Sequence, residues 1–110
     1  MQTAKCRINA GVCGFVSEVV ARCDDSQTVE LKITSNCEHI TALGGRLGRL
    51  DAFEELARRH ESTVFAEARD PDVWCCVDCV VPCAIFKAMQ SAAGLALGQA
   101  VSVEVEVVRG

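Results

Sequence analysis

The spacing of the apolar residues changes along the chain, from every second residue to every third or fourth. This change restricts the fold more than any other sequence feature. Up to Thr34 the apolar side chains alternate with polar ones, as they do in strands with one buried face. In the segments from Ser35 to about His60 and from Pro82 to Ala96 they recur every three or four residues, as they do in helices with one apolar stripe. This order predicts an α+β protein with two layers, in which a small antiparallel sheet is covered on one face by helices.

The predicted sheet combines N-terminal strands with a C-terminal one. Residues 5–9 and 28–34 alternate, and residues 15–23 are rich in valine as strands often are. The turn at residues 11–14 and a polar loop at residues 24–27 separate these three segments. The stretch 101–108 alternates valines with Ser102, Glu104 and Glu106. We therefore expect it to join the hairpin as a strand, with its valines on the helices and its two glutamates in solvent.

Helix boundaries are marked by capping residues. Ser35-Asn36-Cys37-Glu38 matches a capping box, which predicts a helix whose apolar stripe continues to Leu50. Asp51 is placed to cap a second helix that runs to about His60. Pro82 fits the first turn of a last helix that ends near residues 94–98. Residues 64–68 fit either a strand or a helical turn.

Cysteine is the unusual residue, with eight copies in 110 residues. A chain of this length predicts one domain, at residues 1–110. The N-terminus shows no charged and apolar pattern of a signal peptide, so a cytoplasmic location is expected. In that reducing compartment clustered cysteines favour metal or redox chemistry over permanent disulfides.

Composition also excludes some partners. No run of about eighteen apolar residues predicts a membrane span. The net charge of -4, without a basic cluster, argues against nucleic acid as a partner. No phosphate-binding loop or catalytic triad is evident, so an enzyme is the less favoured reading. A protein partner and a homodimer both stay open.

Three cysteines lie where the backbone can stabilise a thiolate. Cys13 lies in a turn between two glycines, Cys37 at the capped start of a helix, and Cys79 just before the Pro82 helix. Unpaired amides and the helix dipole favour an anion at such positions. Each follows or precedes an element at one end of the sheet, so we expect the three thiols to converge on one metal site.

The fourth ligand is left open by the sequence. Cys76 and Cys79 form a single C-x-x-C motif, and Cys75, Cys83 and Asp78 lie close to it in sequence. Cys6 and Cys23 fall within strand patterns and are expected to be ordinary structural residues. The side chains of His39 and His60 are expected to face solvent, although His39 follows Cys37 closely enough to be a ligand.

The order of these motifs resembles the iron-sulfur cluster assembly scaffolds of the IscU type and of the NifU N-terminal domain. The resemblance lies in G-V-C-G, S-N-C-E and C-V-V-P-C, and it implies that Cys13, Cys37 and Cys79 correspond to the scaffold cysteines. The scaffolds have aspartate where Phe15 stands and histidine where Asp78 stands. G-V-C-G-F, A-I-F-K-A and A-G-L-A-L resemble more closely an uncharacterised family of small cysteine-containing proteins of anaerobic bacteria and archaea.

Three functions are compatible with these patterns. The first is binding of zinc or an iron-sulfur cluster, in cluster assembly or in sulfur or metal trafficking with a sulfur donor or a metalloprotein acceptor. The second is a thiol/disulfide or persulfide protein that uses Cys76 and Cys79. The third is a protein-interaction domain whose cysteines are structural.

Overall fold

The computed structural model describes residues 2–110, in which four strands form an antiparallel sheet in the order β1-β2-β3-β4. The strands are β1 (Gln2–Asn9), β2 (Val16–Cys23), β3 (Thr28–Ser35) and β4 (Arg49–Asp51). The first three match the predicted alternating segments. On β2, for example, Val19 and Ala21 are fully buried, whereas the neighbouring Val20 is turned to the other face.

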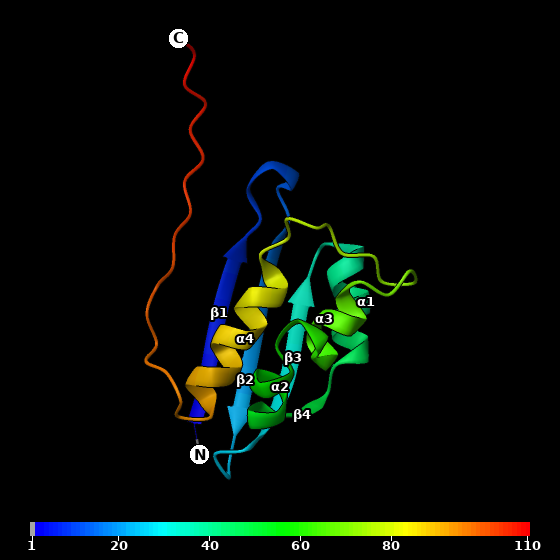
Figure 1. The fold of residues 1–110 in the computed structure, drawn as a ribbon, viewed down its shortest axis with the longest axis vertical. Coiled ribbons are helices and arrows are strands. Elements are labelled where there is room, and N and C mark those ends of the chain that lie inside the picture. Colours follow the sequence, from blue (N-terminus) through cyan, green and yellow to red (C-terminus); the bar gives the residue numbers. More distant parts are fainter. Residues whose placement is uncertain (1) are drawn as a thin grey trace.

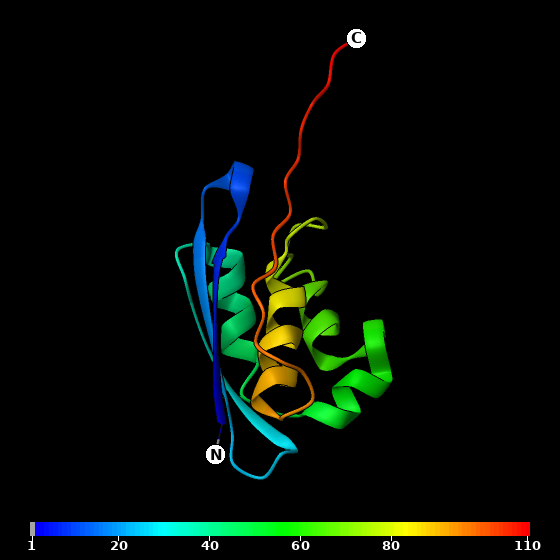
Figure 2. The same cartoon turned by 90° about the vertical axis from the view of Figure 1, so that its left-hand side faces the viewer.

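The helices lie on one face of this sheet, as Figure 2 shows in an edge-on view. They are α1 (Glu38–Arg46), α2 (Ala52–Arg58), α3 (Thr63–Ala68) and α4 (Val81–Ala92), with short 3-10 turns η1 (Gly11–Cys13) and η2 (Arg59–Glu61). α4 covers β1 and β2, and α1 covers β3. The predicted α+β class and the one-sided helical cover are confirmed. None of the helices in residues 2–110 has the length and apolar character needed to cross a membrane.

The core lies between the sheet and the two covering helices. Val19 and Val29 from the sheet meet Leu43 of α1 and Ile85 and Met89 of α4, all of them buried. α1 approaches the sheet closely at Gly44. A Cβ atom there would lie only 3.1 Å from Cβ of Ile33, so glycine allows the close contact that its low helix propensity otherwise opposes.

α1 ends at Arg46, so the prediction that it continues to Leu50 was wrong. Leu47 is extended and buried, and the carbonyl of Gly48 accepts a hydrogen bond of 2.8 Å from the Leu31 amide. Residues 49–51 then form β4, which pairs with β3. Three glycines weaken the helix, and the ladder with β3 satisfies the backbone groups that the helix would otherwise use.

The caps agree with the prediction at α2 and differ at α1. The Asp51 carboxylate accepts from the Glu54 amide at 3.0 Å, as predicted. The Ser35 hydroxyl accepts from the Cys37 amide at 3.0 Å, so Ser35 forms a local turn and Cys37 becomes the N-cap of α1 without a side-chain cap. Residues 64–68, which the sequence left undecided, are helical and belong to α3, and Pro82 lies in the first turn of α4 as expected.

The predicted C-terminal strand is the main error. Residues 101–108 lie outside the helices and strands, and Figure 1 shows this segment leaving the end of α4 and extending past the folded body. Its valines are exposed together with Glu104 and Glu106. Alternation specifies which face of a strand is apolar, but it does not supply a neighbouring strand, and the short β4 completes the sheet instead.

Candidate metal centre

The cysteines predicted as ligands lie at one end of the sheet. Figure 1 shows η1, the N-terminal ends of α1 and α4, and the loop that joins α3 to α4 at this end. Cys13 ends η1 and Cys37 is the N-cap of α1. The loop carries Cys75, Cys76 and Cys79. Segments far apart in sequence therefore meet here, because β1 and β3 both end at this edge.

Backbone hydrogen bonds shape the loop before the cysteines. The Asp70 carbonyl accepts from the amides of Val73 at 2.9 Å and Trp74 at 2.8 Å, and the Cys75 amide donates to the Ala68 carbonyl at 3.0 Å. Val73 is buried. Trp74 has a φ of 51°, which side-chain-bearing residues rarely adopt, and its indole is exposed. The loop thus holds a strained residue directly before Cys75.

His39 connects α1 to this loop. Its Nδ1 lies 2.8 Å from the Val73 carbonyl oxygen, and the side chain is half-buried, so the prediction that it faces solvent was wrong. A carbonyl can only accept, hence Nδ1 donates, and in a neutral imidazole this leaves Nε2 as an acceptor. Metal-binding histidines commonly have this arrangement. The short spacing from Cys37 was the signal in the sequence, but it could not show that the loop folds back onto α1.

The C-x-x-C motif forms a single turn. The Cys79 amide donates to the Cys76 carbonyl at 3.0 Å, and the Val81 amide hydrogen-bonds the Cys79 sulfur. Cys76 is exposed and Cys79 is half-buried, while Asp78 points into solvent at the tip. A backbone N–H that donates to sulfur stabilises the thiolate, so this turn is suited to present Cys79 as a ligand.

The charges of these thiols act on one another. Burial, and after it the neighbouring thiols of Cys79, Cys37 and Cys76, together raise the pKa of Cys75 to about 11. Burial also raises the pKa of Cys79; the Val81 amide opposes this, whereas Cys37, Cys76 and Cys13 add to it. Cys75 and Cys79 are therefore within electrostatic reach of Cys37 and Cys76, and Cys79 is also within reach of Cys13. Without a cation, Cys75 and Cys79 hold their protons at neutral pH.

The two long helices that begin at this end have no side-chain caps. Neither Cys37 at α1 nor Val80 at α4 makes a side-chain cap hydrogen bond within the described chain. The first amides of a helix have no partners inside the helix, and they carry the positive end of its dipole. Both helix starts can therefore stabilise negative charge on the cysteines beside them.

The remaining candidates lie apart from this group. Cys83 is exposed in the first turn of α4 and contributes to neither the Cys75 nor the Cys79 shift. Cys23 is buried in the core, and the Cys6 thiol lies 3.7 Å from the Ala84 carbonyl, so both are structural as predicted. Among residues 2–110, no group of three or more His, Cys, Asp or Glu side chains is placed so that it could hold a metal ion. The five thiols are gathered, and they would have to approach further to share one ion.

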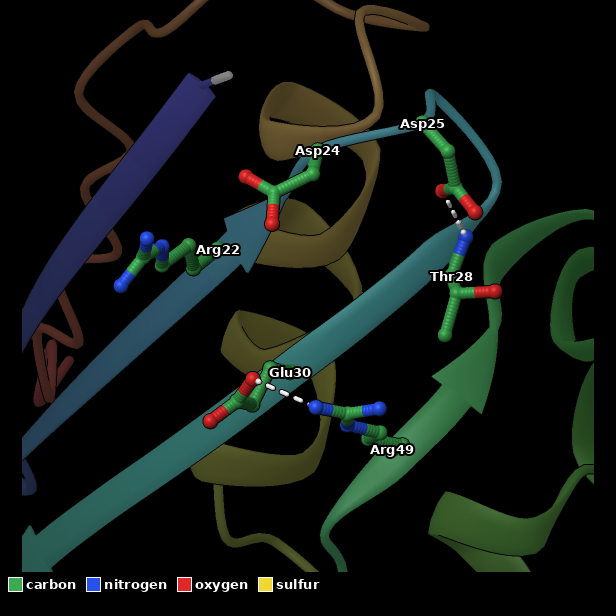
Figure 3. A pocket seen from close by; sticks show the side chains of 6 residues that line it. All are labelled: Arg22, Asp24, Asp25, Thr28, Glu30 and Arg49. Carbon is green, nitrogen blue, oxygen red and sulfur yellow. Dashed lines mark hydrogen bonds and ion pairs between the residues drawn. The ribbon is translucent and has the colours of Figure 1, made fainter.

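A separate hollow lies at the opposite end of the sheet. It measures about 220 Å³ and is lined by charged residues around the turn between β2 and β3 (Figure 3). Two of its carboxylates are already engaged: Asp25 accepts from the Thr28 amide at 2.7 Å, and Glu30 lies 3.5 Å from Arg49. The hydrogen bonds from the Thr28 and Gln27 amides lower the pKa of Asp25 and stabilise the turn. We therefore place the candidate site at the cysteines.

Residues 4–105 match DUF6951, a family of unknown function, and because this covers most of the chain the protein belongs to that family. Neither the curated proteins nor the solved structures contain a significant match to the chain. Family membership assigns no activity, so function has to be argued from the residues.

Proposed function

We propose that this member of DUF6951 is a small metal-binding protein that holds zinc or an iron-sulfur cluster through cysteine thiolates. The ligands we assign are Cys37 at the start of α1 and Cys75, Cys76 and Cys79 in the loop before α4, with Cys13 of η1 as the alternative fourth ligand. The observation that carries the proposal is the gathering of these thiols, from three separate segments, at one end of the sheet.

A cation would relieve the electrostatic conflict among these thiols. Cys75 and Cys79 have raised pKa values because they are partly buried beside other thiols. A bound metal ion favours the thiolate strongly and takes the place of the protons. Metal-sulfur bonds are about 2.3 Å long, so binding would draw the loop toward Cys37. The loop before α4 has no helix or strand of its own to resist that movement.

The surroundings of the cysteines favour transfer to or from another protein. Val12, Trp74 and Val77 are exposed at this end, and Val12 and Val77 make almost no contact with the rest of the chain. Exposed apolar side chains gathered in one region are typical of protein contact surfaces. A sulfur donor or a metalloprotein acceptor is therefore the proposed partner, as the resemblance to cluster scaffolds also implies.

Metal content and absorption of the full chain, purified without oxygen, test the proposal. We expect about one zinc per chain, or iron with sulfide and absorption in the visible range; these two results distinguish zinc from a cluster. Cys37→Ser and Cys79→Ser should each keep the far-ultraviolet circular dichroism of the parent and lose most of the metal, because a serine hydroxyl is a poor ligand at neutral pH.

Cys83→Ser is the matched control, since Cys83 is exposed and lies near the group without contributing to its charges. It should keep the parental metal content. A parent protein that takes up neither zinc nor iron would contradict the proposal and would favour an interaction domain with structural cysteines. Loss of metal in Cys83→Ser together with its retention in Cys37→Ser would show that the ligand set differs from the one we assign.

A redox or persulfide function for Cys76 and Cys79 is the second candidate, supported by the single turn that joins them. Reactive cysteines usually have lowered pKa values, whereas the pKa of Cys79 is raised. We rank this function second for that reason. Rapid alkylation of Cys79 at neutral pH in the metal-free protein, faster than that of Cys83, would reverse the ranking.

A further inference from the structure

The C-terminal segment at residues 101–108 has the pattern of a strand and no strand beside it. Its side chains alternate between valines and the polar residues Ser102, Glu104 and Glu106. Val101 is 61% exposed and Val105 is 89% exposed. In the described chain the segment makes none of the backbone hydrogen bonds of a sheet. A row of apolar side chains with unpaired backbone groups beside it is a ready surface for strand pairing.

The sheet offers a matching edge. β1 pairs with β2 on one side only, and in the strand order of residues 2–110 its other side is the edge of the sheet. β1 has eight residues, as many as the segment 101–108. Its inward residues Ala4 and Cys6 are only half-buried, although they face α4. A further strand at this edge would complete their cover.

The charges of β1 and of the C-terminal segment are complementary as well. On β1, Lys5 and Arg7 project from the solvent face, two residues apart, and on the segment Glu104 and Glu106 have the same spacing. If Val105 lies opposite Cys6 in an antiparallel pair, Lys5 lies opposite Glu106 and Arg7 opposite Glu104. Val103, Val105 and Val107 then fall on the same face as Ala4, Cys6 and Ile8, whereas Val108 falls on the other face. Side chains directly opposite each other in a sheet interact, and opposite charges stabilise the pair.

We propose that residues 101–108 add as a strand to the β1 edge of a second copy of the chain, so that two copies exchange these segments. The direction of the segment favours a second copy, because it runs the same way as its own β1 (Figure 1) and could only pair with it in parallel. A copy related by a two-fold axis offers antiparallel pairing to both segments at once. The exchange leaves neither β1 edge open, so the assembly closes at two chains.

Sedimentation of the full chain over a range of concentrations, with reductant and with or without a metal chelator, tests this exchange. The parent should show a monomer–dimer equilibrium in both conditions. Val105→Asp places a charge in the valine row and should raise the dimer dissociation constant at least about tenfold. Ser102→Asp, which places the same residue on the opposite face of the same segment, should change it by no more than about twofold.

A charge exchange identifies the edge that receives the segment. Glu104→Lys with Glu106→Lys should weaken the dimer, and adding Lys5→Glu with Arg7→Glu should restore it. A parent that is monomeric throughout, a dimer that survives Val105→Asp, or an open series of larger oligomers would each overturn the exchange. A dimer that disappears with chelator alone would also overturn it, because the contact would then depend on the cysteines.

Discussion

The α-helices of this protein begin in two different ways. α2 and α3 begin with side chains that accept from their first amides: Asp51 accepts from Glu54, and Ser62 accepts from Phe65. α1 and α4 have no such side-chain cap, and both begin beside cysteines. The first pair uses its amides within the fold. In the second pair the Val81 amide of α4 donates to the Cys79 sulfur, and the other first amides lie where an anionic ligand set would be stabilised.

This difference separates stability from function in the molecule. Capping at α2 and α3 contributes to folding, so its removal should be measurable as lost stability. Under the proposed function the cysteine end binds metal, so changes there should alter metal content more than the free energy of unfolding. The predictions below test this division, from the largest expected effect to the smallest.

The largest effect on stability is expected at Glu55. Its buried carboxylate accepts from the amides of Thr63 and Val64, both at 3.1 Å, at the start of α3. Glu55→Ala leaves two amides without an acceptor, and hydrogen bonds to a charged group are worth about 1.5–3 kcal/mol each, so a loss of about 3 kcal/mol is expected. Urea denaturation followed by circular dichroism measures it.

Glu54→Ala is the control for this change, because Glu54 is the neighbouring glutamate and its side chain is exposed. It should cost less than about 1 kcal/mol. Metal content per folded chain should stay at the parental level in both variants. A loss below about 1 kcal/mol in Glu55→Ala would show that the caps of α2 and α3 are not a main source of stability.

The next effect concerns His39, which holds the cysteine loop through the Val73 carbonyl. His39→Ala should weaken zinc or iron binding about tenfold or more, as removal of groups that orient metal ligands usually does. Competition with a coloured chelator measures the affinity. His39→Gln can still donate to the carbonyl and should recover part of the binding. An unchanged affinity in His39→Ala would show that the hydrogen bond from α1 to the loop does not contribute to metal binding.

The fold was predictable where an alternating segment lies close in sequence to the strand that pairs with it. Residues 28–34 and residues 101–108 alternate equally well, yet only the first became a strand. β3 follows β2 through a short polar turn, so its neighbour is supplied by the chain itself. β4 was missed for the opposite reason, since a three-residue strand has no period to detect and forms only because the edge of β3 is open.

The candidate site was predictable in its positions but not in its geometry. Glycine, proline and capping residues mark where elements begin, and these marks correctly placed Cys13, Cys37 and Cys79 at the start or end of elements. No local pattern reports that Val73 is buried against α1 and brings His39 to the loop. Contacts of that kind depend on the tertiary packing of segments far apart in sequence.

A smaller effect, with opposite signs at the two kinds of helix start, is expected from cap substitutions. Asp51→Ala should destabilise the protein by about 1 kcal/mol, as loss of an N-cap usually does. In metal-free protein Cys37→Ser should leave stability unchanged or raise it by up to about 1 kcal/mol, because a serine hydroxyl can cap α1. Thermal unfolding with chelator measures both. A clear loss in metal-free Cys37→Ser would mean that the thiol itself stabilises the start of α1.

The smallest effect is the pH dependence of the metal-free protein between about pH 9 and 11. The fold raises the pKa of Cys75 to about 11 from its ordinary value of 9.0, chiefly by burial and then by the neighbouring thiolates. The folded state therefore favours the protonated thiol. This contribution is fully present below the unfolded pKa and is lost as the pH rises through the folded one.

Urea denaturation at several pH values, with chelator present, detects this loss as the difference between the parent and Cys75→Ser. The subtraction isolates the contribution of Cys75 from that of the other ionisable groups. The parent should lose more stability than Cys75→Ser as the pH rises. With metal bound the sign should reverse, because acid reprotonates the thiols and releases the ion, so stability should fall toward low pH. Equal losses of stability toward low pH in the metal-loaded parent and in metal-loaded Cys75→Ser would show that Cys75 is not a ligand, and the uncapped starts of α1 and α4 would then have no metal-bound thiolate from this residue beside them.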